Sequence, residues 1–226
     1  MHTQEVTNSD IPVIQKSGNH FSNEQETRGF DMIASTIFSP IYPVIAGQIL
    51  ERTEKRTGVA LDAGTGPAHL SVAVAKQSEL KVFALDSSPT MLKIAWEHIV
   101  TEDLVQRVVP VLGDVHSIPC EDGTIDLVFS RGSWFFWEEL YQAFQEIYRV
   151  LTPGGIAYIG GGFGNQKLKA EIFHKMNDKG PEFENGVKER LARNSPERIR
   201  TELDKAGIRS YDLIQDESGF WAVMKK

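Results

Sequence analysis

The segment Leu61-Asp62-Ala63-Gly64-Thr65-Gly66-Pro67-Ala68-His69-Leu70 constrains the fold of this chain more than any other. It follows the apolar pair Val59-Ala60, which is typical of a buried strand, and it leads into residues 70–75, which predict a packed helix. A strand, a tight glycine turn and a helix start predict a cradle for a nucleotide-like ligand. Glycines let the backbone approach such a ligand closely, and the helix start offers free N–H groups.

The remainder of the chain alternates strand and helix patterns. Apolar runs predict further strands at 80–86, 108–112, 125–129, 156–159, 211–214 and 220–224, and helical patterns are found at 89–99, 138–150, 166–176 and 196–207. The stretch up to Asn194 that follows the third of these helices carries Gly, Pro and Asn and is predicted to be irregular. The alternation indicates an α/β, Rossmann-like, doubly wound sheet. The last two runs are joined by a short polar loop, so they form a hairpin in which one strand is antiparallel.

The N-terminal part is organised differently. Residues 1–28 are polar and unpatterned and are predicted to be flexible, whereas 29–56 carry apolar residues at helical spacing on both sides of two prolines. We interpret 29–56 as a helical lid over the glycine turn, or as a helix pair packed on the core, or as both. The uncharged stretch 32–50 contains prolines and polar residues, which disfavours a membrane span. The domain boundaries predicted are therefore 1–28, 29–56 and 57–226.

Composition narrows the function classes. The chain of 226 residues has a formal net charge of −7 and no dense basic run, which disfavours nucleic-acid and anionic-membrane partners. Its single cysteine, Cys120, allows no intrachain disulfide and no multi-thiolate metal site, so no metal is expected. A lone cysteine and the lack of a secretory signal pattern predict a cytoplasmic protein. Either a monomer or a homodimer is expected.

The ligand class follows from the glycine turn and two later strand ends. His69 replaces the third glycine of the G-x-G-x-x-G dinucleotide pattern, whereas Asp62-x-Gly64-x-Gly66-x-Ala68 matches D/E-x-G-x-G-x-G with alanine at the last position. Carboxylates also end the next two strands, at Asp86 and Asp114. In these features the chain resembles the class I S-adenosylmethionine (SAM) dependent methyltransferases, and its later motifs are similar to a subgroup of small methyltransferases from anaerobic microbes.

The resemblance implies a seven-stranded sheet of order 3-2-1-4-5-7-6 and a role for each motif residue. Gly64 and Gly66 would cradle the methionine part of SAM with Asp62 near its ammonium, Asp86 would bind the ribose, and Asp114 with Val115 would bind the adenine. The other predicted cofactor contacts are Thr65, Ser87, Met91, Gly113 and Ser130.

The exit of the fourth strand, Ser130-Arg131-Gly132-Ser133-Trp134-Phe135-Phe136-Trp137, lacks the Asn/Asp-Pro-Pro-aromatic motif of amino-directed DNA and protein-glutamine methyltransferases. Its aromatic residues either form an acceptor pocket or belong to the core, and Arg131 either faces an acceptor or forms a buried structural pair. A histidine just after the third strand could act as a general base. The candidate catalytic residues are His116, Ser130, Arg131 and Trp134, and the candidate substrate or lid residues are Phe30, Tyr42, Trp137 and Phe163.

These features predict an enzyme that transfers a methyl group from SAM to a small molecule by in-line displacement and releases S-adenosylhomocysteine. Three alternatives remain open. The chain could bind SAM without methyl transfer, as a sensor, a regulated subunit or an enzyme of other SAM chemistry. It could methylate protein or RNA, or it could be an NAD-dependent enzyme.

Overall fold

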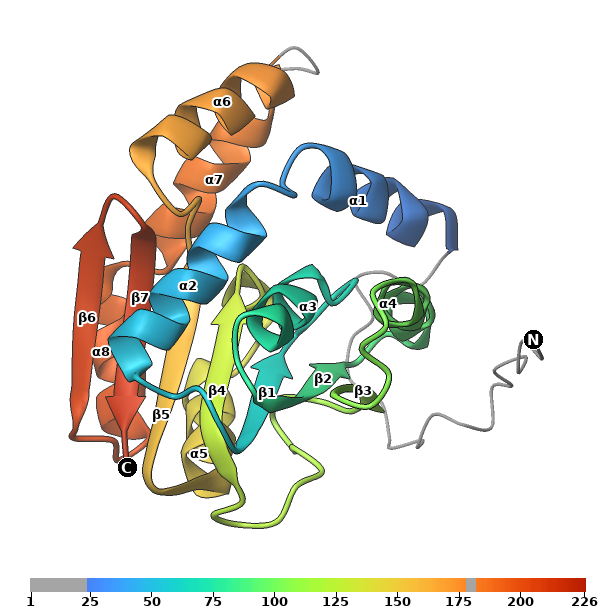
Figure 1. The fold of residues 1–226 in the computed structure, drawn as a ribbon. Helices are drawn as coiled ribbons and strands as arrows, with labels where there is room; N and C mark the ends of the chain where they lie inside the picture. Colours follow the sequence, from blue (N-terminus) through green and yellow to red (C-terminus); the bar gives the residue numbers. More distant parts are fainter. Residues whose placement is uncertain (1–23, 178–181) are drawn as a thin grey trace.

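The computed structural model describes residues 24–177 and 182–226, and it contains one seven-stranded sheet flanked by helices (Figure 1). The strands are β1 (Val59–Ala63), β2 (Lys81–Asp86), β3 (Val108–Leu112), β4 (Ile125–Arg131), β5 (Leu151–Gly161), β6 (Tyr211–Asp216) and β7 (Gly219–Lys225). The helices are α1 (Glu24–Thr36), α2 (Ile41–Thr53), α3 (His69–Lys76), α4 (Pro89–Thr101), α5 (Leu140–Val150), α6 (Gln166–Asn177), α7 (Glu182–Arg193) and α8 (Pro196–Lys205).

The strand order is β3-β2-β1-β4-β5-β7-β6, which confirms the predicted doubly wound fold. The strands from β3 to β5 pair in parallel, and β7 is antiparallel to both of its neighbours. Helices α2, α3 and α4 cover one face, while α5 and α8 cover the other (Figure 1). The strand order reverses between β1 and β4, so their carboxyl ends open a crevice of the kind where doubly wound proteins bind ligands.

Local sequence signals account for several elements. Ser88 caps α4 by accepting a hydrogen bond from the Met91 N–H, and Ser195 caps α8 in the same way, each with proline at the following position. Pro110 lies in β3, which is an edge strand, so its missing N–H costs the sheet little. Helix α5 buries one stripe at helical spacing, made up of Leu140, Ala143, Phe144, Ile147 and Val150.

Beyond residue 130, three predictions of secondary structure were wrong. Strand β5 begins at Leu151 instead of 156, because the proline and glycines that follow are taken up by a shift of register against β4. Helix α5 begins at Leu140, after a 3-10 turn at 134–136 that the sequence did not predict. Helix α7 occupies part of the stretch predicted to be irregular, where Phe183 packs its ring against Phe38 and Phe173.

The three consecutive glycines at the end of β5, Gly160-Gly161-Gly162, are explained by strand packing. A Cβ atom at Gly160 would lie 2.1 Å from the Phe220 carbonyl oxygen, and one at Gly162 would lie 1.8 Å from the Ser218 carbonyl oxygen. Side chains at these positions would therefore collide with the start of β7. The run allows a close approach of β7 to β5, and the backbone that it approaches belongs to the protein itself.

Helices α1 and α2 meet at the predicted proline break. Helix α1 begins at Glu24, inside the segment predicted to be flexible, and residues 1–23 of that segment lie outside the described residues. Among the described residues, no single helix is both long and apolar enough to cross a membrane. Helices α1 and α2 meet the criterion only as a pair bent by 75°. Much of α2 is buried, including Ile41, Ile45 and Ile49, so it also forms part of the core.

Candidate ligand-binding site

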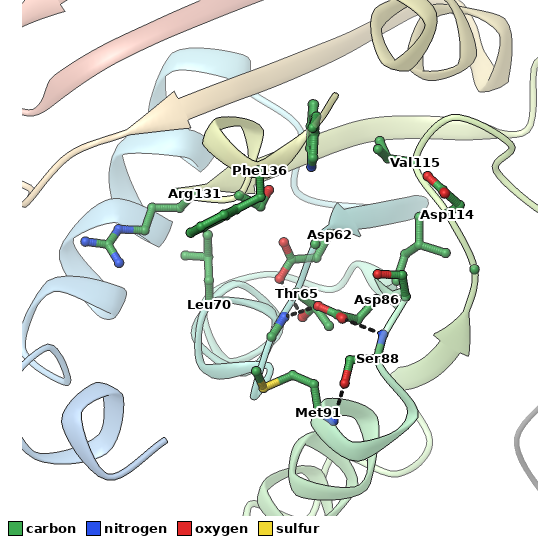
Figure 2. A pocket seen from close by; sticks show the side chains of 18 of the residues that line it. Asp62, Thr65, Leu70, Asp86, Ser88, Met91, Asp114, Val115, Arg131 and Phe136 are labelled. Carbon is green, nitrogen blue, oxygen red and sulfur yellow. Dashed lines mark hydrogen bonds between the residues drawn. The ribbon is translucent and has the colours of Figure 1, made fainter. Parts of the chain in front are cut away.

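A cavity of about 390 Å³ lies at the carboxyl ends of β1 to β4 (Figure 2). Its floor is the glycine turn after β1, its sides are the turns after β2, β3 and β4, and its roof includes Phe30 from α1 and Tyr42 from α2. This volume falls within the range of small-molecule and cofactor sites. The two N-terminal helices therefore contribute to the cavity wall.

The glycine turn is held against β2 and requires its glycines. The backbone N–H groups of Gly64 and Thr65 both donate to the Leu85 carbonyl oxygen, at 2.9 and 2.8 Å. Gly64 has a φ of +73°, and a Cβ atom there would lie 2.5 Å from the Ser133 Cβ. Ala68, which replaces the last glycine of the motif, also has a left-handed φ of +64°. Because alanine adopts that conformation at a cost of about 1–2 kcal/mol, the replacement demands backbone strain, although it takes little room.

Asp62 lies beneath this turn with 1 % of its surface exposed. Its Oδ2 accepts hydrogen bonds from Thr65 Oγ1 at 2.9 Å and from Ser71 Oγ at 2.7 Å. Burial raises the pKa of Asp62 to about 7, and the nearby charge of Asp86 adds to the shift. A cationic group that entered this end of the cavity would stabilise the ionised form of Asp62.

Asp86 ends β2 and joins the glycine turn to the start of α4. Its Oδ2 accepts from the Gly66 N–H and its Oδ1 accepts from the Ser88 N–H, both at 2.9 Å (Figure 2). Burial raises the pKa of Asp86, while the backbone hydrogen bonds oppose that shift. Each carboxylate oxygen retains a further lone pair, so this group can still accept hydrogen bonds from paired hydroxyls such as those of a ribose.

Asp114 follows β3 and is paired with the histidine that the sequence suggested as a base. Asp114 Oδ1 accepts from the His116 backbone N–H at 2.9 Å and lies 2.6 Å from His116 Nδ1. The hydrogen bond between the two side chains is the main reason that the pKa of Asp114 is lowered. The other ring nitrogen, Nε2, is buried and has no hydrogen-bond partner in the described part of the chain. His116 is therefore not placed to receive a proton from a molecule at the far end of the cavity.

Of the serines and tryptophans predicted for the site at the exit of β4, some line the cavity and others are buried. Ser133 lines the cavity and donates to the Ala63 carbonyl oxygen at 2.8 Å, whereas Ser130 is fully buried behind it with its hydroxyl on that of Ser133. Trp137 lines the cavity. Trp134 is 1 % exposed and packs against Phe220, in the core cluster beneath α5. Of the two tryptophans proposed for the acceptor pocket, only Trp137 can contact a ligand there.

Arg131 lines the cavity at the end opposite Asp114 (Figure 2). Its Nε donates to the Gly162 carbonyl oxygen at 3.1 Å, and its guanidinium lies 5.4 Å from the ring centre of Phe38 and 5.6 Å from that of Phe163. Burial lowers the pKa of this guanidinium. No carboxylate of residues 24–177 or 182–226 forms an ion pair with it. The predicted structural pair is thus not found among these residues.

Nearly all of the predicted site residues meet in this cavity. The exceptions are Ser130, Trp134 and Phe163, of which Phe163 belongs to an aromatic cluster behind Arg131. The predicted residues that line the cavity are Phe30, Tyr42, Asp62, Gly64, Thr65, Gly66, Asp86, Ser87, Met91, Gly113, Asp114, Val115, His116, Arg131 and Trp137.

The cavity also contains residues that the sequence analysis missed, notably His69, Glu138, Glu139 and Gln142. The two glutamates directly follow the aromatic run, so their position in the sequence was a usable signal. For His69, the sequence signals only that it replaces the third glycine of the dinucleotide pattern.

Comparison with known proteins identifies the family. A family model described as a methyltransferase domain matches residues 61–159. The solved structure of a protein from Methanococcus maripaludis, assigned to the SAM-dependent methyltransferases, is 42% identical and has a TM-score of 0.88. The match covers 95% of this chain and 97% of that protein.

Curated relatives match over shorter stretches. A malonyl-[acyl-carrier protein] O-methyltransferase from Yersinia pestis is 34% identical over 110 residues, which are 48% of this chain and 39% of that protein. Arginine-hydroxylase NDUFAF5 of Danio rerio is 27% identical over 157 residues, which are 66% of this chain and 47% of the relative. The chain spans less than half of the length of these two relatives. Since the Methanococcus protein is matched over nearly its whole length and carries the same fold, the chain belongs to the class I SAM-dependent methyltransferase family.

Proposed function

We propose that this chain transfers the methyl group of SAM to a small acceptor that carries an anionic group. Support for the SAM end comes from residues that suit its parts. Asp86 offers buried carboxylate oxygens to ribose hydroxyls, and Asp62 offers a carboxylate to the ammonium. Asp114 lies at the third strand end, where the family resemblance implies adenine binding. When bound, SAM supplies an electrophilic methyl on a sulfonium, and the three carboxylates favour such a cationic ligand.

The acceptor class rests on one observation, which is that Arg131 lines the cavity with no carboxylate partner among the described residues. A guanidinium in a partly desolvated site binds carboxylate or phosphate through charge-assisted hydrogen bonds. Phe38 and Phe163 lie against the guanidinium and would limit its freedom to turn toward solvent. An anionic group held by Arg131 would place the rest of a small acceptor between the lid helices and the exit of β4.

This assignment needs no general base in the protein. Methyl transfer by in-line displacement depends mainly on positioning, and a base is required only when the attacking atom begins protonated. A deprotonated atom of the acceptor, other than the anionic group that Arg131 holds, would attack as it is. His116, which is bound to Asp114 at the opposite end of the cavity, is therefore not given a catalytic role.

The experiment that tests the proposal measures S-adenosylhomocysteine release from SAM in a metabolite extract separated by charge. We expect turnover in the anionic fraction. Arg131→Gln should lose most of that turnover while it retains SAM binding by calorimetry, and Arg131→Lys should recover part of it. The control is Arg209→Gln, because the Arg209 side chain is 77 % exposed and pairs with Asp204 at the surface.

Three outcomes would contradict the proposal. Turnover confined to neutral or cationic fractions would refute the acceptor class, and turnover confined to protein or RNA would favour a macromolecular substrate. Tight SAM binding without any S-adenosylhomocysteine release would favour a sensor or an enzyme of other SAM chemistry. The partial similarity to a protein named a hydroxylase is consistent with the second of these.

A further inference from the structure

Three side chains that are far apart in the sequence meet where α1 crosses α3 and α4. Asp31 lies on α1, His69 is the first residue of α3, and His98 lies in the last turn of α4. Asp31 Oδ1 is 3.0 Å from His69 Nε2, and Asp31 Oδ2 is 3.4 Å from His98 Nε2. One ligand atom from each residue can be chosen so that all three lie within 4.8 Å of one another.

The hydrogen bonding of His98 fixes which of its nitrogens carries a proton. His98 Nδ1 lies 2.9 Å from the Pro67 carbonyl oxygen, and a carbonyl can only accept, so Nδ1 must be the donor. In neutral His98 the lone pair of Nε2 therefore points toward the Asp31 carboxylate, which is also only an acceptor. Two acceptors at 3.4 Å repel each other unless a cation lies between them or His98 is itself protonated.

From this geometry we infer that Asp31, His69 and His98 bind a divalent transition-metal ion of the Zn²⁺ type. Imidazole nitrogen and carboxylate oxygen are ordinary ligands of zinc, and a metal-bound histidine commonly donates its other N–H to a backbone carbonyl, as His98 does to Pro67. Ligand atoms around tetrahedral zinc lie about 3.3 Å apart. The separations of 3.0 and 3.4 Å, which run from the two histidines to different oxygens of Asp31, are close to that value.

The surroundings suit a metal ion. A neutral imidazole is the form of histidine that binds metal. The Tyr42 ring stacks on His69 at 5.1 Å between centres and holds that imidazole in place. The Asp31 and His69 side chains are each 18 % exposed and His98 is 24 % exposed, which leaves a route for the ion and for a water as the fourth ligand.

Such a metal would fasten the lid beside the ligand cavity. Phe30, which precedes Asp31, lines the cavity, and its Cε1 approaches the glycine turn at Gly66. A metal ion at Asp31 would therefore tie α1 to the two helices that begin after the glycine turn and after Asp86. The site is structural in this assignment and does not depend on which acceptor the enzyme methylates. The lone cysteine argued only against a thiolate metal site, and the site proposed here contains no cysteine ligand.

The test is a titration of EDTA-treated full-length protein with Zn²⁺ in competition with a chromophoric chelator. Wild type should bind one Zn²⁺ per chain, and Asp31→Asn and His98→Gln should each weaken that binding more than about tenfold. His174→Gln, on the exposed face of α6, serves as the matched control. A second control replaces His2 and His20, which lie outside the described residues, with glutamine.

Two further measurements separate a metal site from an ordinary Asp–His hydrogen-bond cluster. Co²⁺ should give the visible spectrum of a four-coordinate site in wild type, and His98→Gln should lose it. Zn²⁺ should slow backbone hydrogen exchange across α1 in wild type alone. Absence of Zn²⁺ binding, or binding by the Asp31 and His98 variants that equals that of wild type, would overturn the inference and leave an ordinary Asp–His hydrogen-bond cluster.

Discussion

The ionisation of Asp62 should make the stability of the folded chain depend on pH in a predictable direction. The pKa of this buried carboxyl is about 7, against an ordinary value of 3.8. Below pH 4 it is protonated in both the folded and the unfolded chain. Between about pH 4 and pH 7 only the unfolded chain ionises, so the free energy of unfolding falls as pH rises. A difference of about 3 pH units, at about 1.4 kcal/mol each, amounts to on the order of 4 kcal/mol.

The variant Asp62→Asn isolates this effect. Thr65 and Ser71 both donate to the same oxygen of Asp62, so an asparagine whose amide oxygen takes that place keeps both of these hydrogen bonds and removes the charge. We expect the stability of the variant relative to wild type to grow from near zero at pH 4 to on the order of 4 kcal/mol at pH 8. Urea unfolding followed by tryptophan fluorescence measures this difference.

The matched control is Asp103→Asn. Asp103 is exposed and has a left-handed φ of 56°, a conformation that asparagine adopts as readily as aspartate. Its stability difference from wild type is measured at each pH and serves as the reference. If the difference for Asp62→Asn relative to that reference is constant between pH 5 and pH 8, then Asp62 ionises as easily in the folded chain as in the unfolded one, and the reasoning fails.

Three other substitutions test separate parts of the structure. Asp86→Asn removes the charge that accepts two backbone N–H groups and should weaken SAM binding about tenfold or more by calorimetry. Gly64→Ala should destabilise the chain by more than the roughly 1–2 kcal/mol of a left-handed alanine, because its Cβ would meet Ser133, while Gly207→Ala, with φ of +78° and open space, should cost only the conformational part. Ser195→Ala removes the α8 cap and should cost about 1 kcal/mol in thermal or urea unfolding without changing SAM affinity.

The part of the site that the sequence predicted well is the part formed at strand ends. Asp62, Asp86 and Asp114 each belong to or directly follow a recognisable parallel strand, and parallel strands of one sheet deliver their carboxyl ends to one edge. Parallel pairing of these neighbouring strands is therefore enough to bring the three aspartates together. The caps of α4 and α8 were predictable for a similar reason, since they depend on two adjacent residues.

The features that were missed depend on packing between distant segments. A single 3-10 turn sends Trp134 into the core and leaves Trp137 at the cavity, and no local pattern distinguishes the two. The Asp31–His69–His98 cluster forms only because three helices cross at one place. The glycine run beside β7 was visible in the sequence, but the sequence could not say whether a ligand or a neighbouring strand required it.

Helix α2 has a consequence for how this enzyme can change. One side of the helix is core, with Ile45 and Leu50 fully buried, and Arg52 near its end donates to Asp216 at the far edge of the sheet. The same helix presents Tyr42 to the cavity. On the proposed function, a substitution in α2 would change both the wall of the acceptor site and the folding free energy. Mutations in α2 that admit a new acceptor will tend to lower stability, so new specificities should arise more readily in variants that first gain stability elsewhere.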